Sequence, residues 1–456
     1  AAETYEEMWD FIIEDFSKAS ELLDWTPYNS QYGRCTKGMA KAYLADAYMW
    51  KAFRCPEVAA DCYVKAKKEL KDIIDSNTYE LVPNFATNWD PAGFWNKECI
   101  WAMCSDEGNQ WGSWGADRTI TAFNPNMFKW FCACPENGGW GAEYLSWEWY
   151  SSYEHGDTRR DASCATGAVP EADLAKYGIE KSDNVWGYNP YLKDSLGTKD
   201  DNGNVVKPFI NDEGVLAGTK TMQFHFTNGE FAPAIWTTKL WRSARADGNS
   251  WGGQMWAPTI IYGKRYSNVL LDYAECCFRT GEEANGWAAI DQVRNRAWGN
   301  LSVGQDYSRY FGHYNAVYEF NGQNTTMTKY PVGVLSATVA VPSAKEYYTR
   351  LQATPNRVGY VHTSEAWKVA VNEERRKEFN SEWCLCPDMI KSGYIEDHIN
   401  YNYPKDDGGS DYANYPWTKR SFDFDINKMD MPIPATELMK NSALKQNPAY
   451  AGSDSK

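Results

Sequence analysis

Residues 258–296 read PTIIYGKRYSNVLLDYAECCFRTGEEANGWAAIDQVRNR. From Tyr266 onward, apolar side chains recur at the spacing of one helical face, at Val269, Leu270, Tyr273, Ala274 and Cys277. Gly281 is predicted to end this helix, because glycine enters the left-handed cap conformation without a Cβ clash. The stretch therefore predicts an amphipathic helix with a defined C-terminal end.

A second helix is predicted directly after Gly281, with one side formed by Trp287, Ile290, Val293 and Ala297. Two helices joined by so short a loop must lie antiparallel, and the small side chain of Ala274 lets them approach closely. Helical hairpins of this kind occur in many α proteins. The periodicity therefore favours a helical fold but assigns no function by itself.

Further helical patterns occupy both ends of the chain. Residues 3–24 are predicted to form an amphipathic helix, Thr36 to cap an alanine-rich second helix, and residues 58–76 to form a third. A helical pattern returns at residues 364–391. Alanine at close-contact positions suggests packing like that of tetratricopeptide repeats, although no strict repeat of about 34 residues is visible.

The middle of the chain is rich in aromatic residues, glycine and asparagine. The whole chain contains 22 Trp and 30 Tyr among 456 residues, which is more than a soluble core requires. Indole and phenol rings stack on sugars because their flat apolar face meets the C–H face of a pyranose. For any single tryptophan, packing a loop onto the helices is the better prediction. A subset is nevertheless predicted to form an exposed platform for a ligand.

The platform candidates lie on loops beside glycines or polar residues that can hydrogen-bond sugar hydroxyls. They are Trp111 and Trp114 with Asn109, Asp117 and Arg118, then Trp140, Trp186 with Tyr188, and Trp251. Residues 162–257 have no clear periodicity. Within them, residues 199–204 predict a hairpin rather than a calcium loop, because the closing Glu is missing.

Net charge and hydropathy exclude some partners. The net charge of −15 argues against nucleic acid and anionic membrane surfaces as partners. No apolar run approaches the roughly 20 residues that span a bilayer. The sequence begins at Ala1 with a helical pattern and shows no signal peptide. We therefore expect that the N-terminus was processed or that an upstream segment is missing from this sequence.

Motifs for catalysis or metal binding are absent from the sequence. It lacks the fingerprints of nucleotide-binding loops, zinc proteases and serine hydrolases, and its twelve Cys form no CxxC pair. Cys276 and Cys277 are predicted to be buried free thiols. The five His are predicted to be isolated polar loop residues. We therefore expect no metal and no cofactor.

Two groups of charged residues are better predicted as structural than as catalytic. Asp157 and Arg159 lie two residues apart in a turn-forming context and are expected to form an ion pair. Glu374, Glu378 and Glu382 are predicted to share one helical face, with arginines adjacent to them. Counting acidic residues does not rule out a carboxylate pair for glycoside hydrolysis, which needs two carboxyls about 5–10 Å apart.

Four separated blocks, in the same order, resemble the SusD/RagB family of glycan-capturing outer-membrane lipoproteins. The hairpin carries Arg-Tyr, Val-Leu-Leu-x-Tyr-Ala-Glu and Ile-x-x-Val-Arg-x-Arg-Ala, and the helix after Thr36 carries Thr-Lys-Gly-x-Ala. Residues 373–383 read EERRKEFNSEW, and residues 429–450 read MDMPIPATELMKNSALKQNPAY. The blocks cover roughly half of the chain.

The resemblance implies a mostly α, tetratricopeptide-like fold in one domain over residues 1–456. Within it we expect N-terminal helical repeats at 1–80, a loop-rich, aromatic ligand-binding region at 81–257 and the signature hairpin at 258–298. A loop-rich insert at 299–365 and a C-terminal helix with a tail at 366–456 complete the division. It also implies that an N-terminal segment carrying the lipid anchor is absent from this chain.

The function implied by the resemblance is non-catalytic. The protein would bind an oligosaccharide or polysaccharide at the bacterial cell surface and pass it to a SusC/RagA-like TonB-dependent transporter of the outer membrane. The aromatic loops would bind the ligand and the helical face the transporter. Three alternatives remain: a relative serving peptide uptake, a helical glycoside hydrolase with an aromatic-lined cleft, and a helical-repeat scaffold that binds only protein.

Overall fold

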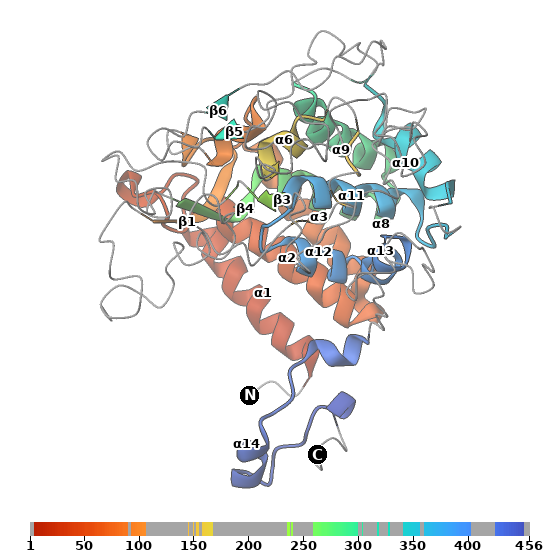
Figure 1. Cartoon of the computed structure of the whole chain (residues 1–456). Coiled ribbons are helices and arrows are strands. Elements are labelled where there is room, and N and C mark those ends of the chain that lie inside the picture. The colour runs from red at the N-terminus through yellow and green to blue at the C-terminus, as the bar shows by residue number, and fades with distance from the viewer. Residues whose placement is uncertain are drawn as a thin grey trace, which may run out of the picture.

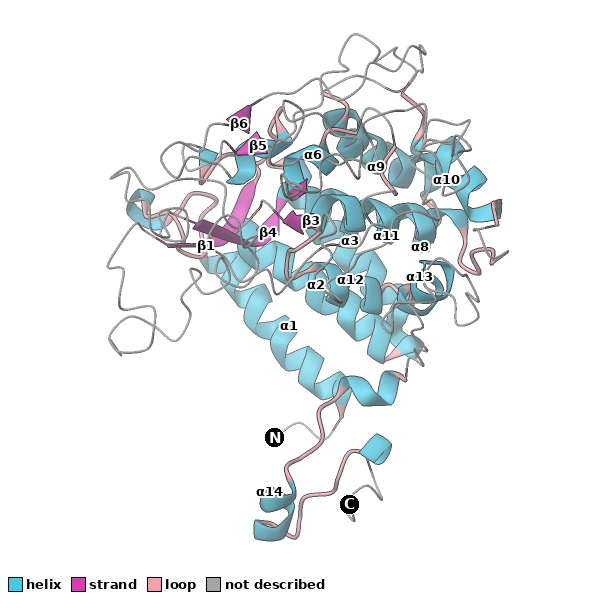
Figure 2. Cartoon of the chain, in the orientation of Figure 1, coloured by secondary structure: helices cyan, strands magenta, loops and turns pink. Residues whose placement is uncertain are grey.

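The computed structural model describes residues 4–89, 93–105, 145, 149, 152–154, 157–166, 235–237, 239, 259–299, 303, 317–318, 327–328, 341–355, 360–402 and 425–450. These residues form a mostly helical fold, as predicted. The long helices lie side by side, and short strands lie at one flank of the helical layer (Figures 1 and 2).

Three helices make up the N-terminal part: α1 (Tyr5–Leu22), α2 (Lys37–Arg54) and α3 (Ala59–Asp75). Short 3-10 turns, η1 (Tyr28–Ser30) and η2 (Pro56–Val58), lie in their connections. All three helices were predicted; the observed ends of α1 and α3 differ from the predicted ones by one or two residues, and α2 begins directly after the predicted cap at Thr36.

Helix α2 packs between two neighbours. The hydroxyl of Thr36 accepts a hydrogen bond from the backbone N–H of Met39 at 3.2 Å, which confirms the predicted N-cap. Leu44 packs toward α1, whereas Ala45 belongs to the core shared with α3 and α8. Small side chains along both sides allow this double contact, which accounts for the alanine content of the helix.

The signature stretch forms the predicted hairpin of α8 (Tyr266–Arg279) and α9 (Glu283–Ala297). Gly281 has φ +80° and ends α8 as predicted. Its N–H donates to the carbonyl of Phe278 at 3.2 Å, and the N–H of Glu282 donates to the carbonyl of Cys277 at 2.8 Å. This pair of bonds is a Schellman cap, which satisfies two carbonyls that the helix end leaves free.

Helix α8 lies at the centre of the fold, packed against α3, α9 and α11 (Ala366–Phe379). The periodicity predicted one buried face, but every residue from Tyr266 to Phe278 is buried. The polar face is enclosed because Arg375 of α11 donates to Asp272 at 2.6 Å and to Glu275 at 2.8 Å. Cys276 and Cys277 are buried free thiols, as predicted.

The C-terminal helices correct two expectations. Helix α10 (Ala344–Ala353) lies inside residues 299–365, which were expected to be loop-rich. Ser343 caps it by accepting a hydrogen bond from the N–H of Glu346 at 3.1 Å, in a Ser-x-x-Glu pattern that is typical of a helix N-terminus. The pattern over 364–391 is two helices, α11 and α12 (Leu385–Lys391), because a turn interrupts it at Ser381, which has φ +59°. Helix α13 (Ile395–Asn402) follows.

The described strands are short and form three two-stranded antiparallel sheets. They pair β1 (Cys99–Ser105) with β4 (Thr259–Arg265), β2 (Cys164–Thr166) with β3 (Ile235–Thr237), and β5 (Val317–Tyr318) with β6 (Met327–Thr328). Strand β4 was not predicted, although it opens the signature stretch. The pair β2–β3 adds local order to residues 162–257, which were expected to be irregular.

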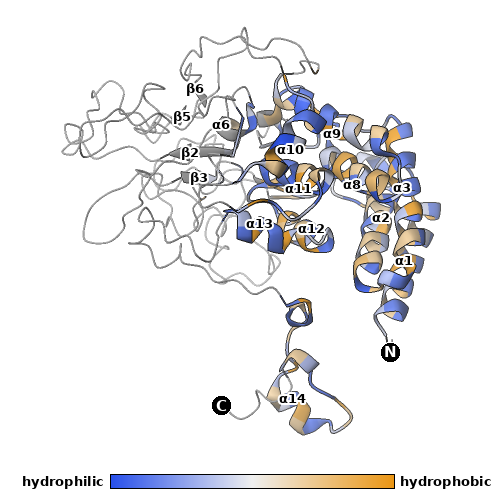
Figure 3. Cartoon of the chain, turned by 90° about the vertical axis from the view of Figure 1, so that its right-hand side faces the viewer, coloured by the Kyte–Doolittle hydropathy of each residue, from blue (hydrophilic) through white to orange (hydrophobic). Residues whose placement is uncertain are grey.

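The C-terminal tail, residues 425–450, extends away from the helical body (Figures 1 and 3). It contains η13 (Ile426–Met429), α14 (Ala435–Lys440) and η14 (Pro448–Tyr450). Asp430 joins it to the body by accepting from Arg54 of α2 at 2.7 Å and from the hydroxyl of Tyr5 in α1.

Among the described helices, none is both long enough and apolar enough to cross a bilayer. The described residues also contain no group of three or more His, Cys, Asp or Glu side chains suited to a metal ion.

Candidate functional site

The predicted binding residues cannot be placed from the described part of the chain. Asn109, Trp111, Trp114, Asp117, Arg118, Trp140, Trp186, Tyr188 and Trp251 all lie outside the described residues. The predicted hairpin at 199–204 lies outside them as well. The structure does describe short segments within this aromatic region, and it shows how they attach to the helices.

The attachment begins at the C-terminal end of α11. The last four carbonyls of a helix have no partner within the helix. Three donors from the aromatic region reach three consecutive carbonyls there, in the residues before Phe379. Trp149 Nε1 donates to the carbonyl of residue 376 at 3.1 Å, the Tyr153 hydroxyl to that of 377 at 2.7 Å, and Lys239 Nζ to that of 378 at 2.8 Å.

The end of α9 is bound in the same way. The backbone N–H and the hydroxyl of Thr158 both donate to the carbonyl of Ala297, at 3.0 and 2.8 Å. Helix α6 (Arg159–Ser163) starts at the next residue. Segments that are far apart in the sequence are therefore held to two helix ends, where the partial negative charge of the helix dipole also favours nearby cations.

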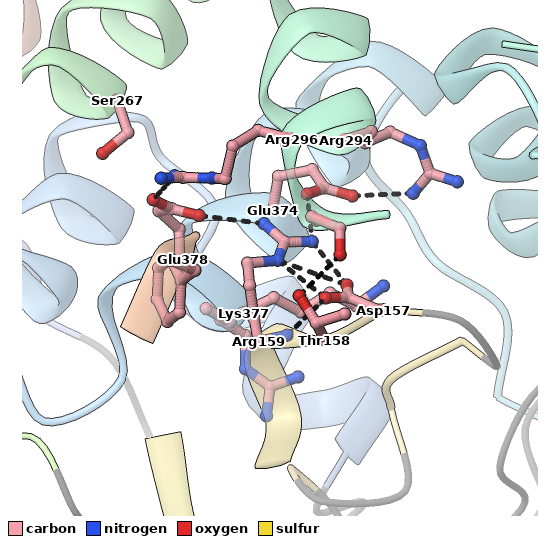
Figure 4. A network of polar contacts seen from close by, with 12 residues as sticks. Asp157, Thr158, Arg159, Ser267, Arg294, Arg296, Glu374, Lys377 and Glu378 are labelled. Carbon is pink, nitrogen blue, oxygen red and sulfur yellow. Dashed lines mark hydrogen bonds and ion pairs between the residues drawn. The ribbon is translucent and has the colours of Figure 1, made fainter. Parts of the chain in front are cut away.

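Arg159 lies at the centre of a buried ionic cluster (Figure 4). Its Nε and Nη2 donate to the carboxylate of Asp157, at 2.9 and 2.6 Å. The same guanidinium donates to Glu374 at 2.8 Å and to Glu378 at 3.1 Å. The predicted ion pair of Asp157 with Arg159 is confirmed, and the pair also connects α6 to α11.

Two further arginines of the signature hairpin extend the cluster. Arg294 binds Glu154 through two parallel hydrogen bonds, at 2.7 and 2.9 Å, and reaches Glu374 at 2.8 Å. Arg296 donates to Glu98 at 2.7 Å and also pairs with Glu378. The hairpin thus binds residues from within and after the aromatic region.

Arg265, at the end of β4, closes the cluster on the other side. It donates to Glu378 at 2.9 Å and to the two oxygens of Glu382 at 2.8 and 3.0 Å. Lys239 shares Glu382 at 2.7 Å. Glu382 lies beyond the end of α11, so the prediction that it shares a helical face with Glu374 and Glu378 was wrong. The turn after α11 nevertheless returns it to the same cluster.

The cluster as a whole is electrically balanced. Its basic members are Arg159, Lys239, Arg265, Arg294, Arg296 and Lys377, and its acidic members are Glu98, Glu154, Asp157, Glu374, Glu378 and Glu382. A buried charge is tolerated when it is paired and hydrogen-bonded. The described cluster meets this condition with equal numbers of opposite charges.

Burial and pairing fix the protonation states. Burial alone would raise the pKa of Glu374, but Arg159 and Arg294 hold its pKa at about 2. The pKa of Glu378 is also lowered, by Arg296, Arg265 and Arg159 against the effect of burial. Burial lowers the pKa of Lys239 to about 8 in spite of the Glu382 carboxylate.

These carboxylates are unsuited to acid–base catalysis. A glycosidase acid needs a raised pKa and contact with the glycosidic oxygen. Glu374 and Glu378 are buried, ion-paired and held ionised. Their predicted structural role is therefore confirmed.

The expectation for histidine was wrong at two positions. His362 is buried, its Nδ1 lies 3.1 Å from Asp397, and its ring stacks on Tyr401 at 3.7 Å. His398 lies in α13 with its Nδ1 3.5 Å from Glu373. The partner carboxylates are distant in sequence, so neither contact could be found from local composition.

Several members of the cluster had no role assigned from sequence. Arg294 and Arg296 lie between the apolar positions Val293 and Ala297 of α9, and Arg265 ends a strand that was not predicted. The sequence signal that could have identified these arginines is their position inside an otherwise apolar hairpin. Arginines at inward positions need buried acidic partners. Lys239 stands among residues without periodicity and offered no such signal.

Comparisons with known proteins agree on one family. The family model described as the SusD family matches residues 97–450 of this chain. No curated protein matches the chain.

Solved structures similar to the chain include surface glycan-binding protein A from three bacteria. The protein from Bacteroides thetaiotaomicron in complex with laminarihexaose has 17% identity and a TM-score of 0.57, over 97% of this chain and 71% of that one. The proteins from Bacteroides uniformis and Bacteroides fluxus each have 19% identity, with TM-scores of 0.52 and 0.53. The match to the Bacteroides uniformis protein covers 97% of this chain and 69% of that protein. The match to the Bacteroides fluxus protein covers 98% of this chain and 70% of that protein. At such identities the likeness establishes the fold.

Proposed function

Because this chain belongs to the SusD family, we propose that it binds an oligosaccharide or polysaccharide at the bacterial cell surface without catalysing a reaction. We further propose that it is lipid-anchored at the outer membrane and delivers the glycan to a SusC/RagA-like TonB-dependent transporter. The family membership agrees with the resemblance found in the four sequence blocks.

One structural observation supports the binding role more than any other. The segments around residues 98, 149–163 and 239 are held to the ends of α9 and α11 by buried hydrogen bonds and ion pairs. Binding sites are commonly carried by loops that a rigid scaffold positions. A fixed base is therefore present for loops whose composition suits stacking on sugar rings.

Trp111 and Trp114 are proposed as the main stacking residues. Replacing both with alanine is expected to weaken binding of a retained glycan by about tenfold or more, because large aromatic anchors dominate such interfaces. Affinity gel electrophoresis with a panel of soluble polysaccharides measures this. Laminarin is the first probe, since a structural neighbour holds laminarihexaose. Trp383→Ala is the control, because Trp383 is exposed in the described α11–α12 turn.

The same panel separates the binding role from the alternatives. Release of reducing sugar at enzyme-like rates would instead support a glycoside hydrolase. Retention of no glycan, combined with binding of a peptide library, would support the peptide-uptake alternative. Unchanged retention in the Trp111→Ala/Trp114→Ala variant would leave the glycan-binding role standing but refute this choice of site.

The outer face of α1 is proposed as a contact surface for the transporter. Phe11 is 66% exposed and Leu22 is 72% exposed, with Tyr5 and Met8 also exposed on this helix. Apolar side chains exposed together mark interaction surfaces. Phe11→Asp with Leu22→Asp is expected to abolish co-purification of the transporter from detergent-solubilised membranes. Val64→Asp is the control, since Val64 is 52% exposed on α3; equal recovery with both variants would refute this face.

A further inference from the structure

One short part of the aromatic region is attached to the helical scaffold at both of its ends. Strands β2 and β3 pair with each other, and Lys239 follows β3 in the sequence. We call β2, β3 and Lys239 the strap. Its first end continues directly from α6, where Arg159 binds three carboxylates. The hydrogen bonds that join its second end to the end of α11 and to the turn after it come from the side chain of Lys239.

The ammonium group of Lys239 lies in largely apolar surroundings. The residue is 2% exposed, and its Nζ lies 4.5 Å from the ring centre of Trp89 and 5.3 Å from that of Phe85, both in η3 (Phe85–Trp89). Nζ donates to the carbonyl of Glu378 at 2.8 Å and to the carboxylate of Glu382 at 2.7 Å. Moving an ammonium out of water is costly, and the rings and these two acceptors have to offset that cost.

Both acceptors of Lys239 are also bound by Arg265. The guanidinium of Arg265 donates to the carbonyl of Glu378 at 3.1 Å and to the two carboxylate oxygens of Glu382 at 2.8 and 3.0 Å. Breaking a buried hydrogen bond is costly mainly because it leaves a partner unsatisfied. If Lys239 leaves this site, Arg265 still satisfies both acceptors. The scaffold therefore remains internally paired when the second end of the strap is released.

The charged groups that face Lys239 are Glu378 in α11, Glu382 in the turn after it and Arg265 at the end of β4, while η3 contributes aromatic rings. Burial lowers the pKa of Lys239 to about 8; Glu382 opposes this shift, Arg265 adds to it and Glu378 opposes it. The ordinary pKa of a lysine is 10.5. A released Lys239 side chain therefore keeps its proton over a pH range in which the docked side chain has lost it.

We propose that the strap detaches from the helical scaffold at Lys239 while the helices stay folded, and that this release takes up a proton from solvent in mildly alkaline medium. At neutral pH Lys239 is mostly an ammonium in both states, so pH has little effect on the release. Between about pH 8 and 10.5 the released side chain carries more protons than the docked one, so rising pH favours the docked strap. The inference goes beyond the proposed function, because it concerns how the aromatic region is held and involves no ligand.

Hydrogen exchange followed by mass spectrometry tests this on the full chain without ligand. Peptides that contain residues 164–166 or 235–239 report on the strap, because a detached pair of strands is only marginally stable and its amides exchange. Exchange is measured in the cold, where reclosing outpaces exchange, and is corrected for the intrinsic effect of pH. At pH 7 the strap should be less protected than α9. Its protection should be about tenfold higher at pH 9 than at pH 7.

Matched variants assign the pH effect to Lys239. In Lys239→Arg the guanidinium stays charged at pH 9, so the protection of the strap should be the same at both pH values. Lys239→Met cannot titrate and should also show no change with pH, which keeps the test decisive if arginine does not fit the site. Lys97→Arg, at an exposed position outside the strap, should retain the tenfold rise. The proposal is overturned by equal protection of the strap and α9 at pH 7, by no rise in the wild type, or by an equal rise in either Lys239 variant.

Discussion

Replacing Arg159 with methionine is expected to lower the free energy of unfolding by about 3–5 kcal/mol. The substitution leaves the carboxylates of Asp157, Glu374 and Glu378 in a buried site without the guanidinium that all three contact. Removing one partner of a buried ionic cluster costs far more than breaking a pair at the surface, because the remaining charges cannot regain water. The loss should detach α6 from α11.

Urea denaturation followed by circular dichroism measures this change. Arg350→Met is the matched control, since Arg350 is exposed on α10 and its guanidinium lies over the ring of Tyr347; the substitution should cost less than about 1 kcal/mol. Equal losses in the two variants would show that the cluster does not stabilise the fold. Because α6 lies within the aromatic region, Arg159→Met should also weaken glycan retention at temperatures where the helices remain folded.

The second large effect is expected in acid. The pKa of Glu374 is about 2 in the folded chain and near 4.5 when it is unpaired. Between these two values the unfolded chain binds more protons than the folded chain, so the free energy of unfolding falls as the pH drops from about 5 to 2. This one carboxylate accounts for on the order of 3 kcal/mol of that loss. Asp397, whose pKa is also lowered to about 2 by His362 against the effect of burial, acts in the same direction.

The difference between the wild type and Glu374→Gln isolates this contribution. It should be largest above pH 5 and should become small near pH 2, where about half of the wild-type Glu374 carboxylates are protonated in the folded chain. Glu437→Gln, in the exposed helix α14, is the matched control and should change the free energy of unfolding only slightly. Urea denaturation at half-unit pH steps provides both curves. A constant difference for Glu374→Gln would mean that its carboxylate titrates alike in the folded and unfolded chain.

Helix positions could be predicted from the sequence because they depend on local spacing. The stripe from Val269 to Cys277, the cap at Thr36 and the stop at Gly281 each follow from a few neighbouring residues, and the structure confirms all three. The turn at Ser381 was missed because a left-handed serine has no sequence signature comparable to that of glycine.

The partners of the charged residues could be predicted only when they were close in the chain. Asp157 and Arg159 lie two residues apart, and their pair was foreseen. Arg294 with Glu154 and Arg265 with Glu378 join residues more than one hundred positions apart. Such pairings depend on how α9, α11 and β4 converge, which a single sequence does not specify. The placement of Trp111 and Trp114 falls outside the described residues, so the main candidate site stays a prediction.

The sequence by itself determined the helical hairpins, their caps and the family, because these are carried by local periodicity and by short blocks in a fixed order. Only the tertiary structure decided that α8 is enclosed on all sides and that the described segments of the aromatic region are held to the ends of α9 and α11. The physical reason is that buried charges and free helix-end carbonyls must find partners in space, and those partners come from distant parts of the chain.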